Sequence, residues 1–170
     1  MRILLFLALS LTLTAAAQND DRGYVISVGE TMPAFELTGL DGTRYTNASL
    51  AGKTVVLQFT ASWCSVCRKE MPELETQVHQ AFKDRQFILI GVDYDEPAEK
   101  VAQFAEQTGV TYPLAPDPAG AVFHSIAAPK AGVTRNVVID SEGTIRMLTR
   151  LYDPEEFEAM VDLIDELTTP

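Results

Sequence analysis

The chain has 170 residues, enough for a single domain with its own hydrophobic core rather than a disulfide-dependent miniature. Its formal net charge is −11, and its longest basic cluster is the pair Arg68-Lys69. Nucleic acids and anionic membrane surfaces are therefore unsuitable partners, because both attract basic surfaces.

The first 20 residues, "MRILLFLALSLTLTAAAQND", have the pattern of a secretory signal peptide: a basic residue, an apolar run and small residues ending at Ala17. A membrane anchor is the alternative, but it needs roughly 20 continuous apolar residues, and Ser10 and Thr12 interrupt this run. No cysteine lies near the expected cut for lipid attachment. We expect a soluble periplasmic or secreted protein without stable membrane insertion. Its expected parts are a signal peptide (1–17), a flexible N-terminal segment (18–28) and one domain (29–170).

The domain should begin with a β-hairpin, because residues 29–53 alternate short apolar pieces with turn-forming dipeptides. We place its turn at Asp41-Gly42. Residues 54–59, "TVVLQF", are apolar on both faces and rich in β-branched side chains, as expected of a central buried strand.

A helix should start near Cys64 and run toward Phe82, bending at Pro72, because the apolar spacing continues beyond the proline. The expected elements after it are a strand (86–93), a helix (96–108), an extended piece (110–117), a helix (119–126), two strands (135–140 and 144–149) and a terminal helix that follows the N-cap Asp153 and ends near Leu167. This order predicts a three-layer α/β fold with an N-terminal β-hairpin and a central helical insert.

The segment "FTASWCSVCRKEMPELE" holds the chain's only two cysteines, Cys64 and Cys67. A zinc site would need His79 and His124 as further ligands, and their spacing does not match the usual motifs. A purely structural disulfide is also disfavoured, because a ring closed over four residues removes little chain entropy. We therefore interpret the two cysteines as a redox pair that needs no metal or other cofactor, and the histidines as surface or packing residues.

The expected helix start gives the two thiols different roles. Cys64 at the first turn meets unpaired backbone N–H groups and the positive end of the helix dipole, which lower the pKa of a thiol. Cys67 lies three residues later on the same helix face, one turn deeper. This predicts an attacking thiolate at Cys64 and a resolving thiol at Cys67.

With Trp63, Glu70 and Pro72 around the cysteines, the segment resembles the active site of thioredoxin-fold disulfide reductases of the exported TlpA/ResA type, whose pattern is W-C-x-x-C-[RK]-x-E-x-P. The resemblance runs from "GETMPAFEL" through "VIDSEGTIRML". It implies a thioredoxin-like fold and a dithiol–disulfide exchange enzyme in which Cys64 attacks and Cys67 resolves. We expect a monomer that reduces protein disulfides and is recharged by a membrane thiol donor. The resemblance also implies that Trp63 packs beside the cysteine pair.

Two polar positions bear on proton transfer. Gln58 stands where cytosolic thioredoxins commonly carry a buried acid, so that proton acceptor is absent here. Glu70 matches an acidic residue that lies near the cysteines in the TlpA/ResA type, where a partly buried carboxylate can carry protons for a thiol. The alternative for Glu70 is a solvated helix residue paired with Arg or Lys.

The stretch Val133-Thr134-Arg135 departs from the family, because Thr134 stands where thioredoxin-fold enzymes place a cis-proline facing the cysteines. A non-proline cis bond costs about 2.5–4 kcal/mol, so we expect a trans bond or a reshaped loop. Arg135 resembles an arginine that peroxiredoxins keep near their reactive cysteine, where it would favour the thiolate of Cys64. Alternatively, it points along the strand edge to water or acidic side chains.

Two other functions stay open. A peroxiredoxin-like thiol peroxidase is the alternative enzyme, although its motif would require Pro in place of Leu57 and Ser or Thr in place of Ala61. A thioredoxin-fold binding module with a permanently closed disulfide is the alternative without catalysis.

Overall fold

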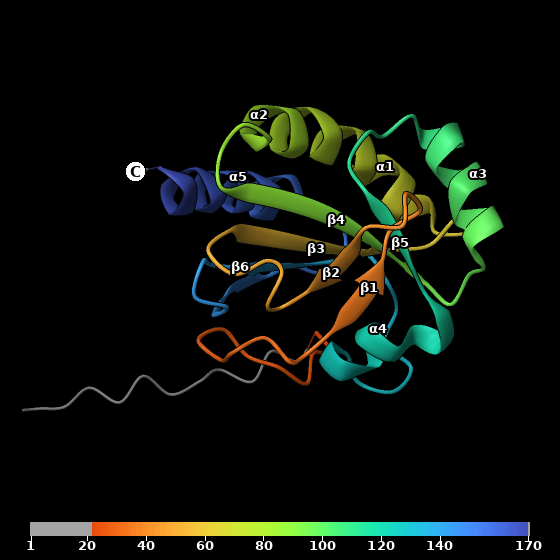
Figure 1. The fold of residues 1–170 in the computed structure, drawn as a ribbon, viewed down its shortest axis with the longest axis horizontal. Coiled ribbons are helices and arrows are strands. Elements are labelled where there is room, and N and C mark those ends of the chain that lie inside the picture. Colours follow the sequence, from red (N-terminus) through yellow and green to blue (C-terminus); the bar gives the residue numbers. More distant parts are fainter. Residues whose placement is uncertain (1–21, 170) are drawn as a thin grey trace, which may run out of the picture.

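The computed structural model describes residues 22–169, so the expected signal peptide lies outside the described residues. A five-stranded sheet forms the middle layer, with the order β5-β4-β3-β6-β7, and a separate two-stranded hairpin, β1-β2, lies beside it (Figure 1). The strands are β1 (Glu36–Thr38), β2 (Arg44–Thr46), β3 (Thr54–Thr60), β4 (Phe87–Tyr94), β5 (Leu114–Asp117), β6 (Arg135–Ile139) and β7 (Ile145–Leu148).

The central strand is β3, which pairs in parallel with β4 and antiparallel with β6. Every residue of β3 is buried, because both faces of the sheet are covered. The helices are α1 (Ser65–Glu73), the π-helix η1 (Leu74–His79), α2 (Gln80–Phe82), α3 (Ala98–Thr108), the 3₁₀-helix η2 (Pro118–Gly120), α4 (Ala121–Ile126) and α5 (Pro154–Thr168). The predicted three-layer α/β fold is confirmed, including the hairpin.

Strand alternation divides the core into two parts. Leu57 and Phe59 of β3 pack in the cluster formed with the hairpin and α4. Val56, the residue before Leu57, faces the other side of the sheet and packs in the cluster formed with α1, α3 and α5. Figure 1 shows these two sets of elements on opposite sides of the sheet. Each fully buried side chain of this size contributes roughly 1.5–3 kcal/mol of hydrophobic stabilisation, so both layers are tied to β3.

The helix after the cysteines continues past Pro72, as predicted, but its geometry changes there. Proline has no N–H to donate, and the following residues of η1 adopt a π-helix before the chain returns to α-helix in α2. The Thr76 hydroxyl donates to the carbonyl of Pro72 at 3.0 Å. The apolar face is kept, because Leu74 and Val78 of η1 are both fully buried.

The start of α3 is two residues later than predicted. Pro97 is extended, with φ −71° and ψ 153°, and serves as the N-cap of α3. Glu96 is therefore not helical, and its carboxylate accepts a hydrogen bond from the backbone N–H of Ser62 at 2.6 Å. A tertiary contact to the loop that precedes the cysteines thus replaces the first helical turn.

The N-terminal part of the described chain is packed rather than free. Tyr24 and Ile26 are buried in the core, and the N–H of Val25 donates to the carbonyl of Ile126 at 2.9 Å. Of the segment expected to be flexible, residues 18–28, the part from Arg22 onward lies against α4 and the end of the sheet.

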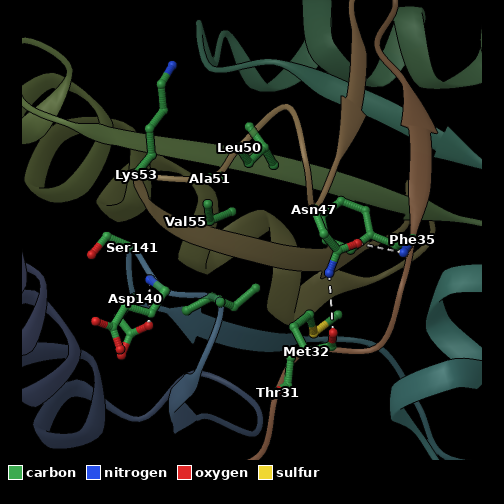
Figure 2. Close-up of a pocket in the computed structure, with 13 residues that line it drawn as sticks. Thr31, Met32, Phe35, Asn47, Leu50, Ala51, Lys53, Val55, Asp140 and Ser141 are labelled. Carbon is green, nitrogen blue, oxygen red and sulfur yellow. Dashed lines mark hydrogen bonds between the residues drawn. The ribbon is translucent and has the colours of Figure 1, made fainter.

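A cavity of about 150 Å³ lies under the hairpin at the start of β3, the opposite end of that strand from the cysteines. Figure 2 shows Asn47 beside the segment that carries both Met32 and Phe35. Its side-chain oxygen accepts from the N–H of Phe35 at 2.9 Å, and its amide donates to the carbonyl of Met32 at 3.2 Å. These bonds join the segment before β1 to the residue after β2 and so close the base of the hairpin.

Candidate active site

Cys64 and Cys67 lie at the N-terminus of α1, just after β3, and are joined by a disulfide. Cys64 is the N-cap residue and is 8% exposed, whereas Cys67 is fully buried. The N–H of Cys67 donates to Sγ of Cys64 at 3.1 Å. A backbone donor and the positive end of the helix both stabilise negative charge on this sulfur once the disulfide is reduced. The predicted difference in depth between the two sulfurs is confirmed.

Thr134 is the closest polar neighbour of the disulfide. Its Oγ1 lies 3.1 Å from Sγ of Cys64 and 3.1 Å from Sγ of Cys67. The residue has φ 66°, in the left-handed region, and residues 22–169 contain no cis peptide bond. The expected reshaped loop is therefore confirmed, with Thr134 facing the cysteines. The hydroxyl contact itself was not predicted, because sequence gives no side-chain direction at an unusual φ.

The other predicted neighbours lie farther out. Trp63 is 62% exposed, so its indole lies largely on the surface beside the more buried Cys64 rather than packed in the core. Val133 is buried, and its carbonyl accepts a hydrogen bond from Nη1 of Arg150 at 3.1 Å. Leu151, which was not predicted, donates its N–H to the carbonyl of Thr134 at 2.8 Å and exposes its side chain.

Arg135 binds the N-terminal segment. Its Nε donates to the carbonyl of Gly132 at 2.9 Å, and its Nη2 donates to the carbonyl of Arg22 at 2.8 Å. The guanidinium carbon lies 4.4 Å from the centroid of the Tyr24 ring, a cation–π geometry. The described contacts thus give Arg135 a packing role on the hairpin side of the sheet. They do not support the predicted guanidinium beside Cys64, and the alternative of a water-exposed arginine is wrong because the residue is buried.

Glu70 is 1% exposed, so the solvated alternative is wrong. It lies one turn after Cys67 on the buried face of α1. Its two carboxyl oxygens accept hydrogen bonds from Nδ2 of Asn136 at 2.7 Å and from Nε2 of Gln58 at 3.3 Å. Burial raises the pKa of Glu70 to about 7, although these two hydrogen bonds act in the opposite direction. A carboxyl group that titrates near neutral pH can both take and give a proton.

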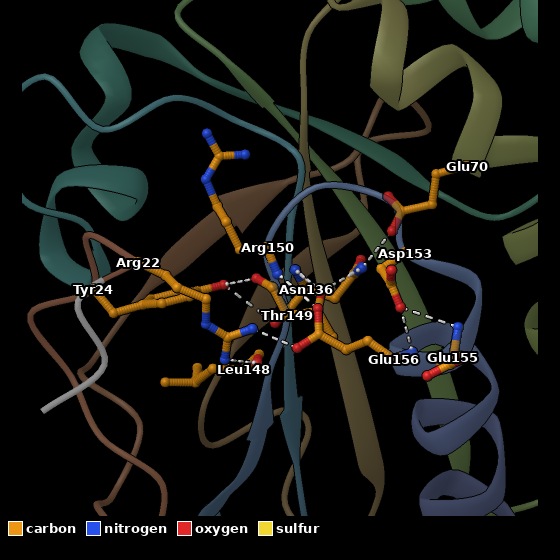
Figure 3. A network of polar contacts seen from close by, with 10 residues as sticks. All are labelled: Arg22, Tyr24, Glu70, Asn136, Leu148, Thr149, Arg150, Asp153, Glu155 and Glu156. Carbon is orange, nitrogen blue, oxygen red and sulfur yellow. Dashed lines mark hydrogen bonds and ion pairs between the residues drawn. The ribbon is translucent and has the colours of Figure 1, made fainter. Parts of the chain in front are cut away.

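A buried polar network holds Glu70 in place. Figure 3 shows Glu70 and Asn136 pointing toward each other, with Thr149 beyond them. Nδ2 of Asn136 also donates to Oγ1 of Thr149 at 2.9 Å. On the other side, the Tyr112 hydroxyl donates to Oε1 of Gln58 at 2.8 Å, which turns the amide nitrogen of Gln58 toward Glu70. Gln58 therefore occupies the expected buried position as a donor to Glu70 rather than as an acid.

A second buried acid lies near the cysteines and was missed. Asp93, at the end of β4, pairs in register with Thr60 and is fully buried, and neither of its carboxyl oxygens accepts a hydrogen bond. Burial and the negative charge of Glu96 raise the pKa of Asp93 to about 8. Glu96 in turn accepts from the backbone and side chain of Ser62 and forms an ion pair with Lys100. The signal in the sequence is "DYDEP", an acid-rich stretch whose first two residues end the buried strand β4.

The described part of the chain, 22–169, contains no group of three or more His, Cys, Asp or Glu side chains arranged to hold a metal ion. Within the same residues, no helix is both long and apolar enough to cross a membrane.

Comparisons with known proteins agree with this geometry. A family model described as Redoxin matches residues 27–164. The thiol-disulfide oxidoreductase ResA of Geobacillus kaustophilus is 29% identical over 140 residues, which cover 82% of this chain and 79% of the relative.

Solved structures show the same likeness. The solution structure of a candidate protein disulfide isomerase from Bacteroides thetaiotaomicron is 53% identical, with a TM-score of 0.83, and the match covers 86% of this chain and 92% of that one. The crystal structure of a candidate thiol:disulfide interchange protein DsbE from Chlorobium tepidum is 25% identical, with a TM-score of 0.72 and coverage of 82% and 96%. With its Cys64–Cys67 disulfide at the start of α1, the chain belongs to the Redoxin family and is a thioredoxin-fold thiol–disulfide oxidoreductase similar to ResA.

Proposed function

We propose that this protein is an exported reductase of protein disulfides in which Cys64 attacks and Cys67 resolves. The observation that carries the proposal is the asymmetry of the pair: Cys64 is 8% exposed and accepts a hydrogen bond from the Cys67 N–H, whereas Cys67 is fully buried. A substrate sulfur can therefore reach Cys64 but not Cys67. Thiolate accessibility decides which sulfur exchanges first.

The reaction follows from this asymmetry. The Cys64 thiolate attacks one sulfur of a substrate disulfide, a Cys64–substrate disulfide forms, and the other substrate sulfur leaves as a thiolate. Cys67 then loses its proton and attacks Sγ of Cys64, which releases the second substrate thiolate. The substrate gains two electrons, and the cysteine pair loses two in forming the disulfide. A thiol donor of lower potential must then reduce that disulfide.

Glu70 is the proposed proton acceptor for Cys67. It follows Cys67 by one turn on the same buried helix face, and its pKa of about 7 lies near neutral pH, where a general base is most effective. The proton returns to Cys67 when the donor reduces the disulfide. No metal or organic cofactor takes part in this scheme, because the two cysteines carry both electrons.

The setting of the reaction is also a proposal. The signal-like N-terminus favours a periplasmic or secreted location, and similarity to proteins named ResA and DsbE agrees with export. The partners would be folded or unfolded proteins with accessible disulfides, together with a membrane thiol donor. The acidic surface of a monomer with net charge −11 makes nucleic acid an unsuitable partner.

The test is insulin disulfide reduction with a thiol reductant as the electron source. We expect Cys64→Ser to abolish the activity, and Cys67→Ser to retain the first attack and accumulate mixed disulfides that mass spectrometry detects at Cys64. Peroxide consumption under the same conditions should stay at the background rate. Peroxide consumption without insulin reduction would instead identify a peroxidase, and an unreactive disulfide would identify a binding module.

A further inference from the structure

The Thr134 hydroxyl occupies a central position between the two reacting sulfurs. Its oxygen is equally far from both, at 3.1 Å, and the residue is only 1% exposed. Sγ of Cys64 has a second donor, the Cys67 N–H. For Sγ of Cys67, the Thr134 hydroxyl is the polar group within hydrogen-bond range among residues 22–169. A fully buried thiolate at Cys67 therefore depends on this hydroxyl, since unpaired buried charge is costly.

The backbone holds Thr134 in an unfavourable conformation. A β-branched residue with φ 66° is rare, and such strain is typical of positions where the surrounding structure fixes a functional group. Two hydrogen bonds provide that constraint here. The Thr134 N–H donates to the carbonyl of Phe59 at 3.0 Å, and its carbonyl accepts from the Leu151 N–H at 2.8 Å. The hydroxyl is thus positioned by β3 on one side and by the segment after β7 on the other.

We propose that the Thr134 hydroxyl is a catalytic hydrogen-bond donor that serves whichever of the two sulfurs carries negative charge. The inference rests on the exchange reaction proposed above and deepens it. A hydroxyl has one proton and two acceptor lone pairs, so it donates to one sulfur at a time and can accept from the other.

The hydrogen bond changes partner as the reaction proceeds. In the reduced enzyme, Thr134 donates to the Cys64 thiolate and accepts from the Cys67 thiol. After Cys64 attacks the substrate disulfide, its sulfur is neutral, and the Thr134 proton turns toward Cys67 as that thiol gives its proton to Glu70. The Cys67 thiolate then attacks Sγ of Cys64, the Cys64–Cys67 bond forms, and the substrate thiolate leaves. Thr134 is neither protonated nor oxidised at any step.

The experiment compares Thr134→Val, which removes the hydroxyl and keeps the branched shape, with Thr134→Ser, which keeps the hydroxyl. Thr60→Val is the matched control, because Thr60 is also fully buried nearby and its hydroxyl contacts the sulfur of Met71 instead. Two quantities are measured on the full protein: the pH midpoint for alkylation of reduced Cys64, and the lifetime of the mixed disulfide that oxidised glutathione forms at Cys64.

Thr134→Val should raise the alkylation midpoint by about one to two pH units, since a hydrogen bond to a charged group has that worth. It should also lengthen the mixed-disulfide lifetime at least about tenfold, because the Cys67 thiolate loses its donor. Thr134→Ser should restore both values, and Thr60→Val should change neither. A folded Thr134→Val protein with the midpoint and lifetime of Thr60→Val would overturn the proposal, as would failure of Thr134→Ser to restore them.

If Thr134→Val does not fold, Thr134→Gly replaces it, because glycine accepts φ 66° without strain and also lacks the hydroxyl. The same two shifts are then expected, and their absence contradicts the proposal. Neither measurement uses a protein substrate. If the wild-type protein does not reduce insulin, the proposed function is contradicted, but the role of the hydroxyl can still be measured.

Discussion

Glu70 and Asp93 are both buried carboxyl groups, one on α1 and one at the end of β4, yet their surroundings differ. Glu70 accepts hydrogen bonds from two amide groups, whereas the oxygens of Asp93 accept none and the negative Glu96 lies close by. The pKa of Glu70 is raised to about 7 and that of Asp93 to about 8, from starting values of 4.5 and 3.8. The two amide donors of Glu70 oppose the effect of its burial, whereas nothing donates to Asp93 and the negative charge of Glu96 adds to the effect of its burial.

The raised pKa values of Glu70 and Asp93 change the stability of the fold with pH in the same direction. A carboxyl group whose pKa is higher in the folded state binds its proton more tightly there than in the unfolded chain. Its contribution to stability is present at low pH and is lost as the pH rises through the folded pKa. The window is about 4 to 8 for Asp93 and about 4.5 to 7 for Glu70.

The largest expected effect is that of Asp93→Asn on stability at alkaline pH. The variant removes the ionisation, and its amide can donate to Glu96, so it should avoid a loss on the order of 1.4 kcal/mol per pH unit within the window. Urea unfolding at pH 5, 7 and 9 measures the difference, which should grow with pH. Asp84→Asn, at an exposed position, is the control. If both variants follow the wild-type pH dependence, ionisation of Asp93 does not lower the stability of the folded protein.

Glu70→Gln should give a smaller gain in stability, because its window is narrower, and a clear change in chemistry. Glutamine cannot take a proton, so the inflection near pH 7 in the rate of thiol exchange should disappear while the fold is kept. Asp93→Asn should leave that inflection in place, and so should Glu106→Gln at an exposed site. An unchanged pH–rate profile in Glu70→Gln would show that Glu70 has only a structural role.

The sequence was most informative where the determinants are local. The order of strands and helices, the depth of Cys64 and Cys67, and the Asp153 cap follow from periodicity and helix ends, and all agree with the structure. The burial of Glu70 followed only from the resemblance. Neither alternative for Arg135, a place beside Cys64 or a solvated strand edge, matches its contacts with Tyr24 and Arg22, which depend on how the N-terminal segment folds back.

The positions that were missed depend on distant parts of the chain meeting. Thr134 and Cys64 are 70 residues apart, and the left-handed φ of Thr134 is set by hydrogen bonds to Phe59 and Leu151. No local pattern encodes such a conformation for a β-branched residue. Asp93 illustrates the same limit, since an acid at the end of a strand is usually solvated and only the packed structure shows that this one is buried.

The smallest expected effect is that of a change at Tyr112, which acts on the pKa of Glu70 through Gln58. Tyr112 does not contact Glu70 through any described hydrogen bond, but its hydroxyl donates to Oε1 of Gln58 and so directs Nε2 of Gln58 toward Glu70. Without that donor, Gln58 can rotate its amide and present oxygen to Glu70 instead. The ionised carboxylate would lose a donor, while the protonated carboxyl would gain an acceptor.

Tyr112→Phe should therefore raise the pKa of Glu70 and make it more like Asp93, moving the inflection in the thiol-exchange profile to higher pH by up to about one unit. The cost in stability should be about 1 kcal/mol, the usual net value of one hydrogen bond. Tyr152→Phe, at a half-buried tyrosine, is the control and should leave the profile unchanged. If Tyr112→Phe leaves the inflection at its wild-type position, the Gln58 donor does not set the pKa of Glu70. The higher pKa of Asp93 then rests on its burial without a donor and on the negative charge of Glu96, and Asn136 is the donor that holds down the pKa of Glu70.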